Sequence, residues 1–142
     1  MSAVNFHVLS DSAPDAHLRY SCRLAEQAFD AGESVFIRTS SSEESRRLDD
    51  LLWTYSDRTF LPHEVSDSGA PSHERVRILI GERLPAAGTS DVVINLGSDS
   101  EGVVGFQRVD EIVVSDGERK RLARERFKQY RDKGMQPVTT NV

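Results

Sequence analysis

The chain has 142 residues and a formal net charge of −5, with 29% charged and 37% hydrophobic residues, a balance typical of one ordinary globular domain. No apolar run approaches the length that crosses a membrane, and the opening MSAVNFHVLS lacks the basic start and apolar core of a secretory signal. Cys22 is the single cysteine, which excludes an internal disulfide framework and a cysteine-based metal cage. We therefore expect a cytoplasmic protein with no membrane contact.

The first 55 residues alternate between strand-like and helix-like patterns. A short apolar run is followed by the segment SAPD (12–15), which has the spacing of a capping box and predicts a helix start. Apolar residues then recur at helical spacing and include Cys22, which we expect to be a buried packing residue rather than a nucleophile. The expected elements are a strand at 4–9, a helix at 15–31, a strand at 34–39 and a helix from 41 or 42 to 55. This order predicts a parallel, doubly wound α/β arrangement.

The rest of the chain adds three predicted strands and one helix. Pro62 favours an extended backbone at Leu61, and residues 66–74 have the composition of a loop. The expected elements are strands at 76–80, 91–96 and 109–114 and a helix from 118 to about 133. The strand at 91–96 is expected at the centre of the sheet, because it is almost wholly apolar. We expect residues 1–135 to form a single α/β domain and residues 136–142 to be a flexible C-terminal tail.

Motifs of catalysis and nucleotide binding are missing from the sequence. No GxGxxG follows the first strand, and no GxxxxGK[ST], GxSxG or HExxH is present. The four histidines are scattered without the spacing of metal ligands: His7, His17, His63 and His73. The sequence therefore predicts no catalytic residue, no metal ligand and no cofactor, and it argues against an autonomous enzyme.

Trp53 lies on the wrong side of its predicted helix to join the core. Leu48, Leu51, Leu52 and Tyr55 follow helical spacing and predict the buried face, whereas Trp53 lies about 140° from Leu48. Phe60 and Leu61 follow soon after the helix and are close enough to share a surface patch with Trp53. An exposed aromatic cluster of this kind is typical of a protein interface. The alternative is that residues 60–63 fold back and cover Trp53 within the domain.

Positive charge gathers near the end of the acidic chain. Between residues 119 and 133 lie eight of the 18 basic residues and two acidic ones, so this stretch carries a charge of +6 and the remainder −11. The basic residues are Arg119, Lys120, Arg121, Arg124, Arg126, Lys128, Arg131 and Lys133. Such asymmetry favours a defined docking patch over a surface that coats nucleic acid, because the acidic body repels a phosphate backbone.

A helical projection places most of these cations on one side of the predicted helix. Lys120, Arg124, Phe127, Lys128 and Arg131 fall within an arc of about 100°, while Ala123, Tyr130 and Gly134 lie on the side expected to face the domain. Cations beside an aromatic ring suit a peptide end that carries acidic residues, an apolar side chain and a free carboxylate, because the arginine fork donates two parallel hydrogen bonds. Such a face also attracts a phosphate backbone, and many basic runs are simply solvated helix faces.

Two stretches of the sequence carry a resemblance to a known family. RLDDLLWTYSDRTFLPHEV (47–65) and LARERFKQYRDKGM (122–135) resemble the chi subunit of bacterial DNA polymerase III holoenzyme, and the likeness extends over nearly the whole length. The resemblance implies a single Rossmann-like α/β domain with a mixed, mostly parallel sheet, no nucleotide-binding loop, no bound nucleotide and no active site. It also implies a replication adaptor, which links the clamp loader, through the psi subunit, to the single-stranded DNA-binding protein.

The resemblance also assigns residues to two binding surfaces. The positions that match the family's site for the acidic C-terminal tail of the single-stranded DNA-binding protein are Val113, Lys120, Arg124, Phe127, Lys128 and Arg131. Phe127 departs from the family's usual tyrosine, so the apolar ring is kept and the hydroxyl is lost. The surface that faces psi, and that is also implicated in binding an accessory helicase, includes the positions of Trp53 and Phe60, with Leu61 adjoining them.

The leading hypothesis is therefore a non-catalytic adaptor with two surfaces, which meets nucleic acid only indirectly. The alternative is a module that binds single-stranded nucleic acid directly through the same basic helix. A nucleotide-dependent enzyme on the same scaffold is disfavoured by the missing phosphate loop.

Overall fold

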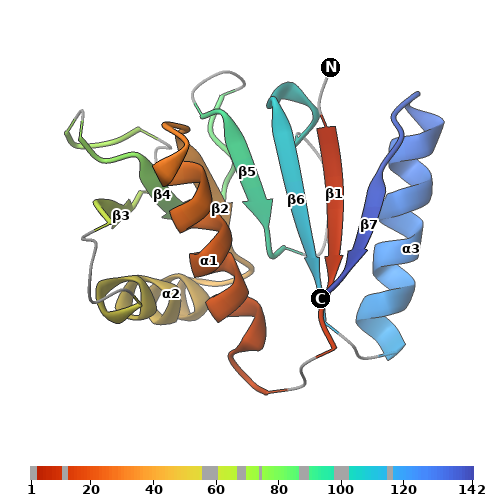
Figure 1. Ribbon diagram of the computed structural model, residues 1–142, viewed down its shortest axis with the longest axis horizontal. Helices are drawn as coiled ribbons and strands as arrows, with labels where there is room; N and C mark the ends of the chain where they lie inside the picture. Colours follow the sequence, from red (N-terminus) through yellow and green to blue (C-terminus); the bar gives the residue numbers. More distant parts are fainter. Residues whose placement is uncertain are drawn as a thin grey trace.

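The computed structural model describes residues 3–10, 13–55, 61–66, 70–73, 75–86, 90–97, 103–114 and 117–142. Three helices and seven strands make up this part of the chain (Figure 1). In chain order they are β1 (Ala3–Val8), α1 (Ala16–Asp30), β2 (Val35–Arg38), α2 (Ser42–Thr54), β3 (His63–Val65), β4 (Ile78–Gly81), β5 (Val92–Asn95), a 3₁₀ turn (Val103–Gly105), β6 (Arg108–Val113), α3 (Gly117–Asp132) and β7 (Val138–Asn141). No helix in these ranges is long and apolar enough to cross a bilayer.

The strands form one open sheet in the order β3-β4-β2-β5-β6-β1-β7. Each of the six pairings is parallel, so the expectation of a mixed sheet is wrong for the described strands. The physical reason is that every strand is joined to the next by a helix or a long segment, and a parallel pair requires such a crossover. β5 lies at the centre of the sheet and is buried along its length, as its sequence predicts. The α/β class and the Rossmann-like arrangement are confirmed.

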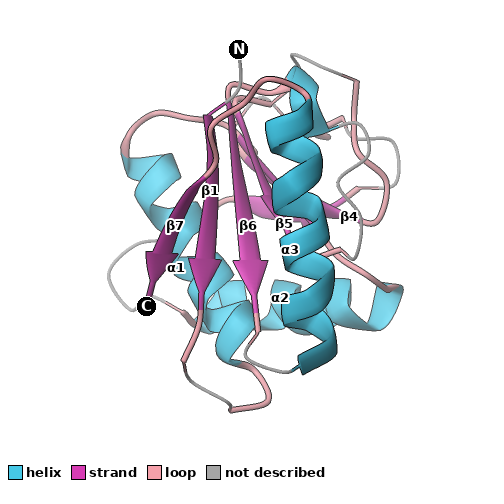
Figure 2. Ribbon diagram, turned by 90° about the vertical axis from the view of Figure 1, so that its right-hand side faces the viewer, coloured by secondary structure: helices cyan, strands magenta, loops and turns pink. Residues whose placement is uncertain are grey.

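The alternation of side chains along the strands creates two cores, one on each face of the sheet. Val35 and Ile37 of β2 point toward α1 and α2, whereas Phe36 between them packs in the cluster on the opposite face, to which α3 belongs. Figure 1 shows α1 and α2 over one half of the sheet, and Figure 2 shows α3 against the other face, beside β6 and β1. The result is a three-layer sandwich in which each helix buries one stripe.

The segment predicted to be a loose tail is in fact part of the sheet. Gly134 adopts a positive φ of 87°, which lets the chain turn at the end of α3, and Met135 is buried. The chain then returns as β7, in which Thr139 pairs with Phe6 and Thr140 with His7 of β1. The prediction failed because a four-residue strand gains its stability from a neighbour 133 residues away, which no local pattern reveals.

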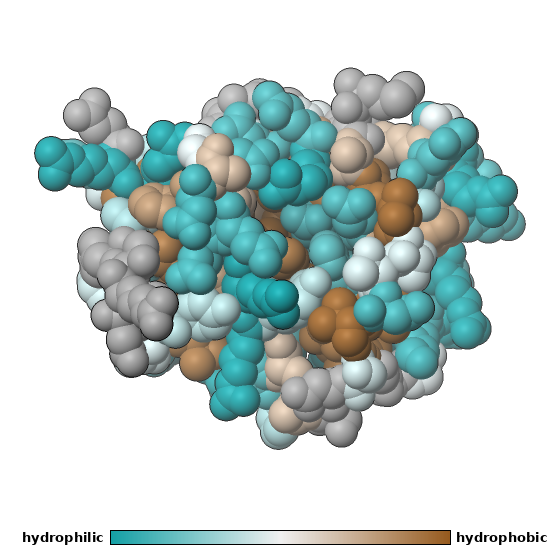
Figure 3. Space-filling model, viewed as in Figure 1, coloured by the Kyte–Doolittle hydropathy of each residue, from teal (hydrophilic) through white to brown (hydrophobic). Residues whose placement is uncertain are grey.

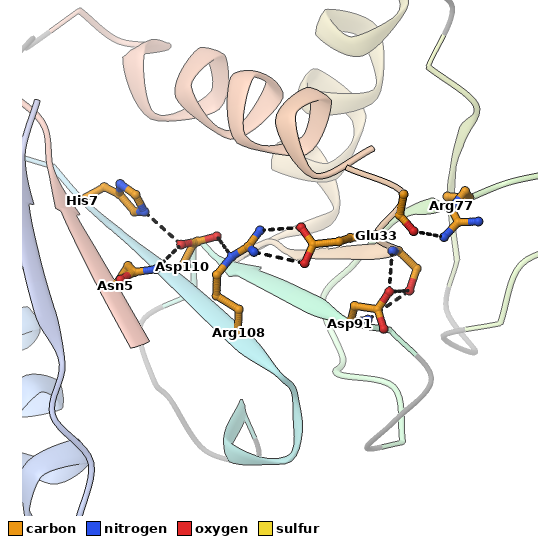
Figure 4. A network of polar contacts seen from close by, with 9 residues as sticks. Asn5, His7, Glu33, Arg77, Asp91, Arg108 and Asp110 are labelled. Carbon is orange, nitrogen blue, oxygen red and sulfur yellow. Dashed lines mark hydrogen bonds and ion pairs between the residues drawn. The ribbon is translucent and has the colours of Figure 1, made fainter. Parts of the chain in front are cut away.

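A chain of polar contacts ties β1 and β6 to the turn before β2 (Figure 4). Asp110 lies 3.0 Å from the His7 ring and 3.3 Å from Arg108 Nε, and Arg108 in turn forms an ion pair with Glu33. Burial alone would lower the pKa of Arg108, but Asp110 and Glu33 outweigh that effect and raise it. Because these groups come from two strands and a turn, the network fixes the register at the amino ends of the strands.

The position of α3 is set by a fully buried carboxylate, Glu111 of β6. The Tyr130 hydroxyl donates to Glu111 Oε2 at 2.7 Å, and Asn95 Nδ2 of β5 donates to Oε1 at 3.0 Å. Arg126 Nε lies 3.5 Å from the same Oε1 and is buried as well, unlike most basic residues of this stretch. A buried charge is tolerated only with such partners, so the rotation of α3 about its own axis is tightly specified.

Helix α2 begins with a hydrogen-bonded cap. The Ser41 hydroxyl accepts from the backbone N–H of Glu44, and the Glu44 carboxylate accepts from the backbone and side chain of Ser40 and faces His17 at 3.4 Å. Burial alone would raise the pKa of Glu44, but the hydrogen bonds from His17 and Ser40 outweigh burial and lower it. The predicted start of α2 is therefore confirmed.

The start of α1 differs from its prediction. The N-cap of α1 is Asp15, whose side chain forms no cap hydrogen bond, and Ser12 lies outside the described residues.

Tyr130→Phe is expected to destabilise the fold by about 1.5–3 kcal/mol, because it removes a hydrogen bond to a buried charged group without changing the ring. The measurement is the free energy of unfolding from urea denaturation, followed by circular dichroism. Tyr55→Phe is the matched control, since Tyr55 is exposed at the end of α2 and its hydroxyl should contribute less than about 0.5 kcal/mol. Equal stabilities for the two variants would contradict this role of Tyr130.

Glu44→Gln is expected to lower the free energy of unfolding at neutral pH by about 1 kcal/mol, the usual size of a helix-cap contribution. The folded pKa of Glu44 lies below its ordinary value of 4.5, so its stabilisation is complete above that pH and is lost as the pH falls through the folded value. The difference between parent and variant should therefore shrink on acidification below about pH 4.5. Thermal melts of both proteins from pH 7 to pH 3 measure this difference in stability. A difference that stays constant over that range would refute the assignment.

Candidate functional site

Helix α3 divides sharply into a buried stripe and a cationic face. Ala123 and Tyr130 are buried against the sheet, as the helical projection predicts, whereas Gly134 is exposed beyond the end of the helix. The predicted cations Lys120, Arg124, Lys128 and Arg131 are all exposed. Phe127 lies on the border between the two sides and is half-buried, with its ring centroid 5.3 Å from that of Phe6 of β1. The helix thus presents its cations directly beside an apolar surface.

A hollow of about 370 Å³ lies between this face of α3 and the strands next to it. Its apolar part is formed by side chains of β1, β6 and α3, and two cations stand at its rim. The lining residues are Phe6, Val8, Val113, Lys120, Ala123, Arg124, Phe127 and Thr139. A second hollow continues along α3 and shares Arg124 and Phe127 with the first, adding Lys128, Arg131 and Asp132. We call the two hollows together the basic groove.

The basic groove brings together the six residues expected to bind a tail peptide. Val113 supplies part of the floor at the end of β6, Phe127 joins the two hollows, and the four cations lie along α3. Figure 2 faces this side of the molecule, with β7, β1 and β6 side by side and α3 next to them. The arrangement offers an apolar recess flanked by positive charge, which matches the chemistry of a peptide end with an apolar side chain and carboxylates.

Not every basic residue of the C-terminal stretch is available to a ligand. Arg121 forms ion pairs with Glu118 and Glu125 on its own helix, and the hydrogen bonds that it donates to Glu118 raise its pKa. Arg126 is buried against Glu111. By contrast, Lys120, Arg124, Lys128 and Arg131 form no ion pair with any residue that the structure describes. Within the described residues, the four cations that line the groove thus have no acidic partner.

Five residues that line the basic groove were not among its predicted members: Phe6, Val8, Ala123, Thr139 and Asp132. Phe6 and Val8 alternate on β1 and so share a face of the sheet, a signal that was present in the pattern. Nothing local showed that this face lies against α3, because that depends on β1 standing between β6 and β7. Thr139 was missed with the rest of β7.

The second predicted surface, around Trp53, is only partly as expected. Trp53 is 57% exposed on α2, and the edge of its ring meets the His63 ring at a centroid distance of 4.9 Å. The alternative in which residues 60–63 cover Trp53 thus holds for one side of the ring. Phe60 lies outside the described residues. In Figure 3, which shows the side seen in Figure 1, hydrophobic groups form separate patches among hydrophilic residues.

Leu61 does not belong to this exposed patch, and its prediction is wrong. It is 1% exposed and packs in the core cluster with Leu48 and Leu52 of α2. The physical reason is that the chain at Leu61 is already entering β3, which turns the side chain into the sandwich. Tyr55, expected on the core face, is instead exposed at the C-cap of α2, where the helix ends before the core can cover it.

The remaining reactive side chains have structural surroundings. Cys22 is fully buried, and burial raises the pKa of its thiol to about 12, so its prediction as a packing residue is confirmed. His7, His17 and His63 each face a carboxylate at 3.0–3.4 Å. Within the ranges that the structure covers, no three His, Cys, Asp or Glu side chains come together as a metal site.

The fold is shared with a solved structure. The C-terminal domain of the Sulfolobus solfataricus SWI2/SNF2 ATPase aligns with a TM-score of 0.53, covering 80% of this chain and 57% of that chain. At 14% sequence identity, this likeness shows the fold alone.

The sequence is similar to a set of bacterial proteins of one name, DNA polymerase III subunit chi. The chain is 33% identical over 135 residues to the one from Pseudomonas aeruginosa, covering 94% of this chain and 92% of that protein. It is 28% identical over 114 residues to the one from Escherichia coli (80% and 77%) and 27% identical over 139 residues to the one from Haemophilus influenzae (96% and 95%). The model of the DNA polymerase III chi subunit family, HolC, matches residues 1–138, and the chain therefore belongs to this family.

Proposed function

We propose that the protein is a non-catalytic adaptor of the DNA polymerase III assembly, located in the cytoplasm. Its basic groove binds the acidic C-terminal tail of the single-stranded DNA-binding protein, and the surface around Trp53 binds the psi subunit and thereby the clamp loader. The observation that carries the proposal is the row of four exposed cations without described acidic partners, set beside an apolar hollow in a chain of net charge −5.

The groove suits an acidic peptide end in three respects. The first hollow, at about 370 Å³, has room for one large apolar side chain, and Phe6, Val113 and Phe127 supply dispersion contacts. Arg124 lies between the two hollows, where its planar fork can hold a carboxylate by two parallel hydrogen bonds. Lys128 and Arg131 extend the positive surface for acidic residues farther up the peptide. Phe127 provides the ring without a hydroxyl, so its part is apolar.

The psi surface rests on Trp53, with Phe60 retained on the sequence resemblance. A tryptophan that leaves more than half of its surface in water is a frequent anchor of protein interfaces. Leu61 is not part of this surface because it is buried. The same surface is proposed to receive an accessory helicase.

Direct binding of single-stranded nucleic acid is less well supported. Proteins of that kind place several exposed aromatic rings along a basic channel so that successive bases stack on them. The basic groove contains a single half-exposed ring, Phe127, within the described residues, since Phe6 is buried beneath it. A gel shift of the protein alone with bare single-stranded DNA at physiological salt is expected to show no complex.

Arg124→Ala is expected to weaken binding of a ten-residue peptide from the C-terminus of the single-stranded DNA-binding protein by about 1.5–3 kcal/mol, the range for a charge-assisted hydrogen bond. Isothermal titration calorimetry measures this, and added salt should weaken parent binding because the cations are exposed. Arg121→Ala is the matched control, since Arg121 lies on the same helix but is paired with Glu118 and Glu125. Equal losses for both variants would show a general charge effect in place of a defined site.

Trp53→Ala is expected to abolish co-purification with psi while leaving binding of the tail peptide unchanged. The reason is that α2 lies far from α3, the helix that carries the cations of the basic groove (Figure 1). Arg124→Ala should give the reverse pattern and serves as the control. Pull-down from co-expressing cells, with calorimetry on the same preparations, measures both activities. Retention of psi by Trp53→Ala would contradict the assignment, and loss of both activities together would indicate misfolding.

A further inference from the structure

The outer edge of β7 is an unprotected strand edge. β7 ends the sheet, its four residues are all exposed, and Val138 is 56% exposed. Proteins usually guard such an edge with a charge, a proline, a bulge or a very short strand. The opposite edge of the sheet, β3, is guarded by its length of only three residues. The four residues of β7 (Val138–Asn141) include no charged residue and no proline, and valine and threonine favour a strand because they are β-branched. The edge is therefore suited to receive another strand.

The backbone of β7 identifies which groups face outward. The Val142 N–H donates to Val8 O, and Val142 O accepts from the Ser10 N–H, so the polar groups of Val142 point toward β1. Backbone direction alternates along a strand, so those of Thr140 also point toward β1, whereas the N–H and C=O groups of Thr139 and Asn141 point away from the sheet. Among the described strands, none lies on that side.

This edge is also the open side of the basic groove. The groove has α3 as one wall, and Phe6, Val8 and Thr139 form part of its floor, but the sheet stops at β7. A strand added at the usual spacing of about 4.8 Å beyond β7 would extend this floor. Its alternate side chains would then stand on the same face of the sheet as Thr139, the face on which Phe127 and Arg124 line the groove.

The electrostatics of α3 select the direction of such a strand. The chain passes from β6 through α3 to β7 in parallel order, so α3 runs opposite to β7 and its N-terminal end lies at the carboxyl end of β7. A terminal carboxylate is favoured at that end by the helix dipole and by Lys120. The span from Lys120 to Arg131 is about 16 Å at 1.5 Å per residue, the length of about five extended residues.

We propose that the acidic C-terminal peptide binds as an eighth strand on the outer edge of β7, parallel to it, with its terminal carboxylate at the Lys120 end of the groove. This inference rests on the proposed function, because the occupant is the same peptide. The new element is the mode of binding, which is strand addition. The main chain of the peptide forms hydrogen bonds with the backbones of Thr139 and Asn141, while its side chains contact the cations of α3.

The test is a set of ten-residue tail peptides, each with one backbone N-methyl group at a successive position, titrated into the intact protein. N-methylation removes one N–H and leaves the side chains unchanged. Strand addition predicts losses of about tenfold or more at every second position and small effects between them, because only alternate residues face β7. Uniform small effects would overturn the inference and leave the proposed function standing. An unmodified peptide that fails to bind would instead overturn the proposed function.

A variant of the protein gives an independent check. Thr139→Pro removes the outward N–H, and an edge strand tolerates proline at such a position. It should weaken the unmodified peptide about tenfold. Thr140→Val should bind like the parent, because the backbone groups of Thr140 point toward β1 and its side chain does not line the groove. Co-purification with psi reports folding of both variants. If the two variants bind equally, or if sedimentation shows a dimer of the parent that Thr139→Pro abolishes, the edge serves another purpose and the inference is wrong.

Discussion

The whole arrangement depends on one buried charge, the Glu111 carboxylate beneath α3. Removing a carboxylate from water is so costly that its partners are effectively compulsory, and three of them come from outside its own strand: Asn95, Arg126 and Tyr130. Two of these lie on α3, so the helix has one permitted rotation. Since Lys120, Arg124, Lys128 and Arg131 lie on the opposite side of that helix, a contact at the centre of the protein determines where its positive charge meets the solvent.

The positive surface of the basic groove consists of cations that have no carboxylate partner among the described residues. Arg108, Arg121 and Arg126 all have carboxylate partners, and they hold the fold together on the sheet, along the helix and between the two. The cations of the groove have none among the described residues, while the body of the protein is acidic. Local attraction combined with general repulsion favours a short anionic ligand over a long polyanion.

Much of this was readable in the sequence, and the failures share a cause. The helical period placed Ala123 and Tyr130 inside and the cations outside, because a helix records its buried face every three or four residues. Nothing comparable records which strands are neighbours, so Phe6 and Thr139 were missed as partners of α3. β7 failed for the same reason, since it is held by a strand distant in the chain. Leu61 was misplaced because the helical period of α2 does not record where the following segment enters the sandwich.

The place of β1 in the sheet has a consequence for biosynthesis. β1 precedes the other described elements in the chain, yet both of its neighbours, β6 and β7, come from beyond residue 107. During translation the apolar side chains of Val4 and Phe6 therefore have no partner strand until β6 and β7 have emerged from the ribosome. Long-range parallel pairing of this kind forms slowly and leaves unpaired edges exposed to aggregation. We expect β1 of the nascent protein to need protection by chaperones, and the yield to depend on the speed of synthesis through β6 and β7.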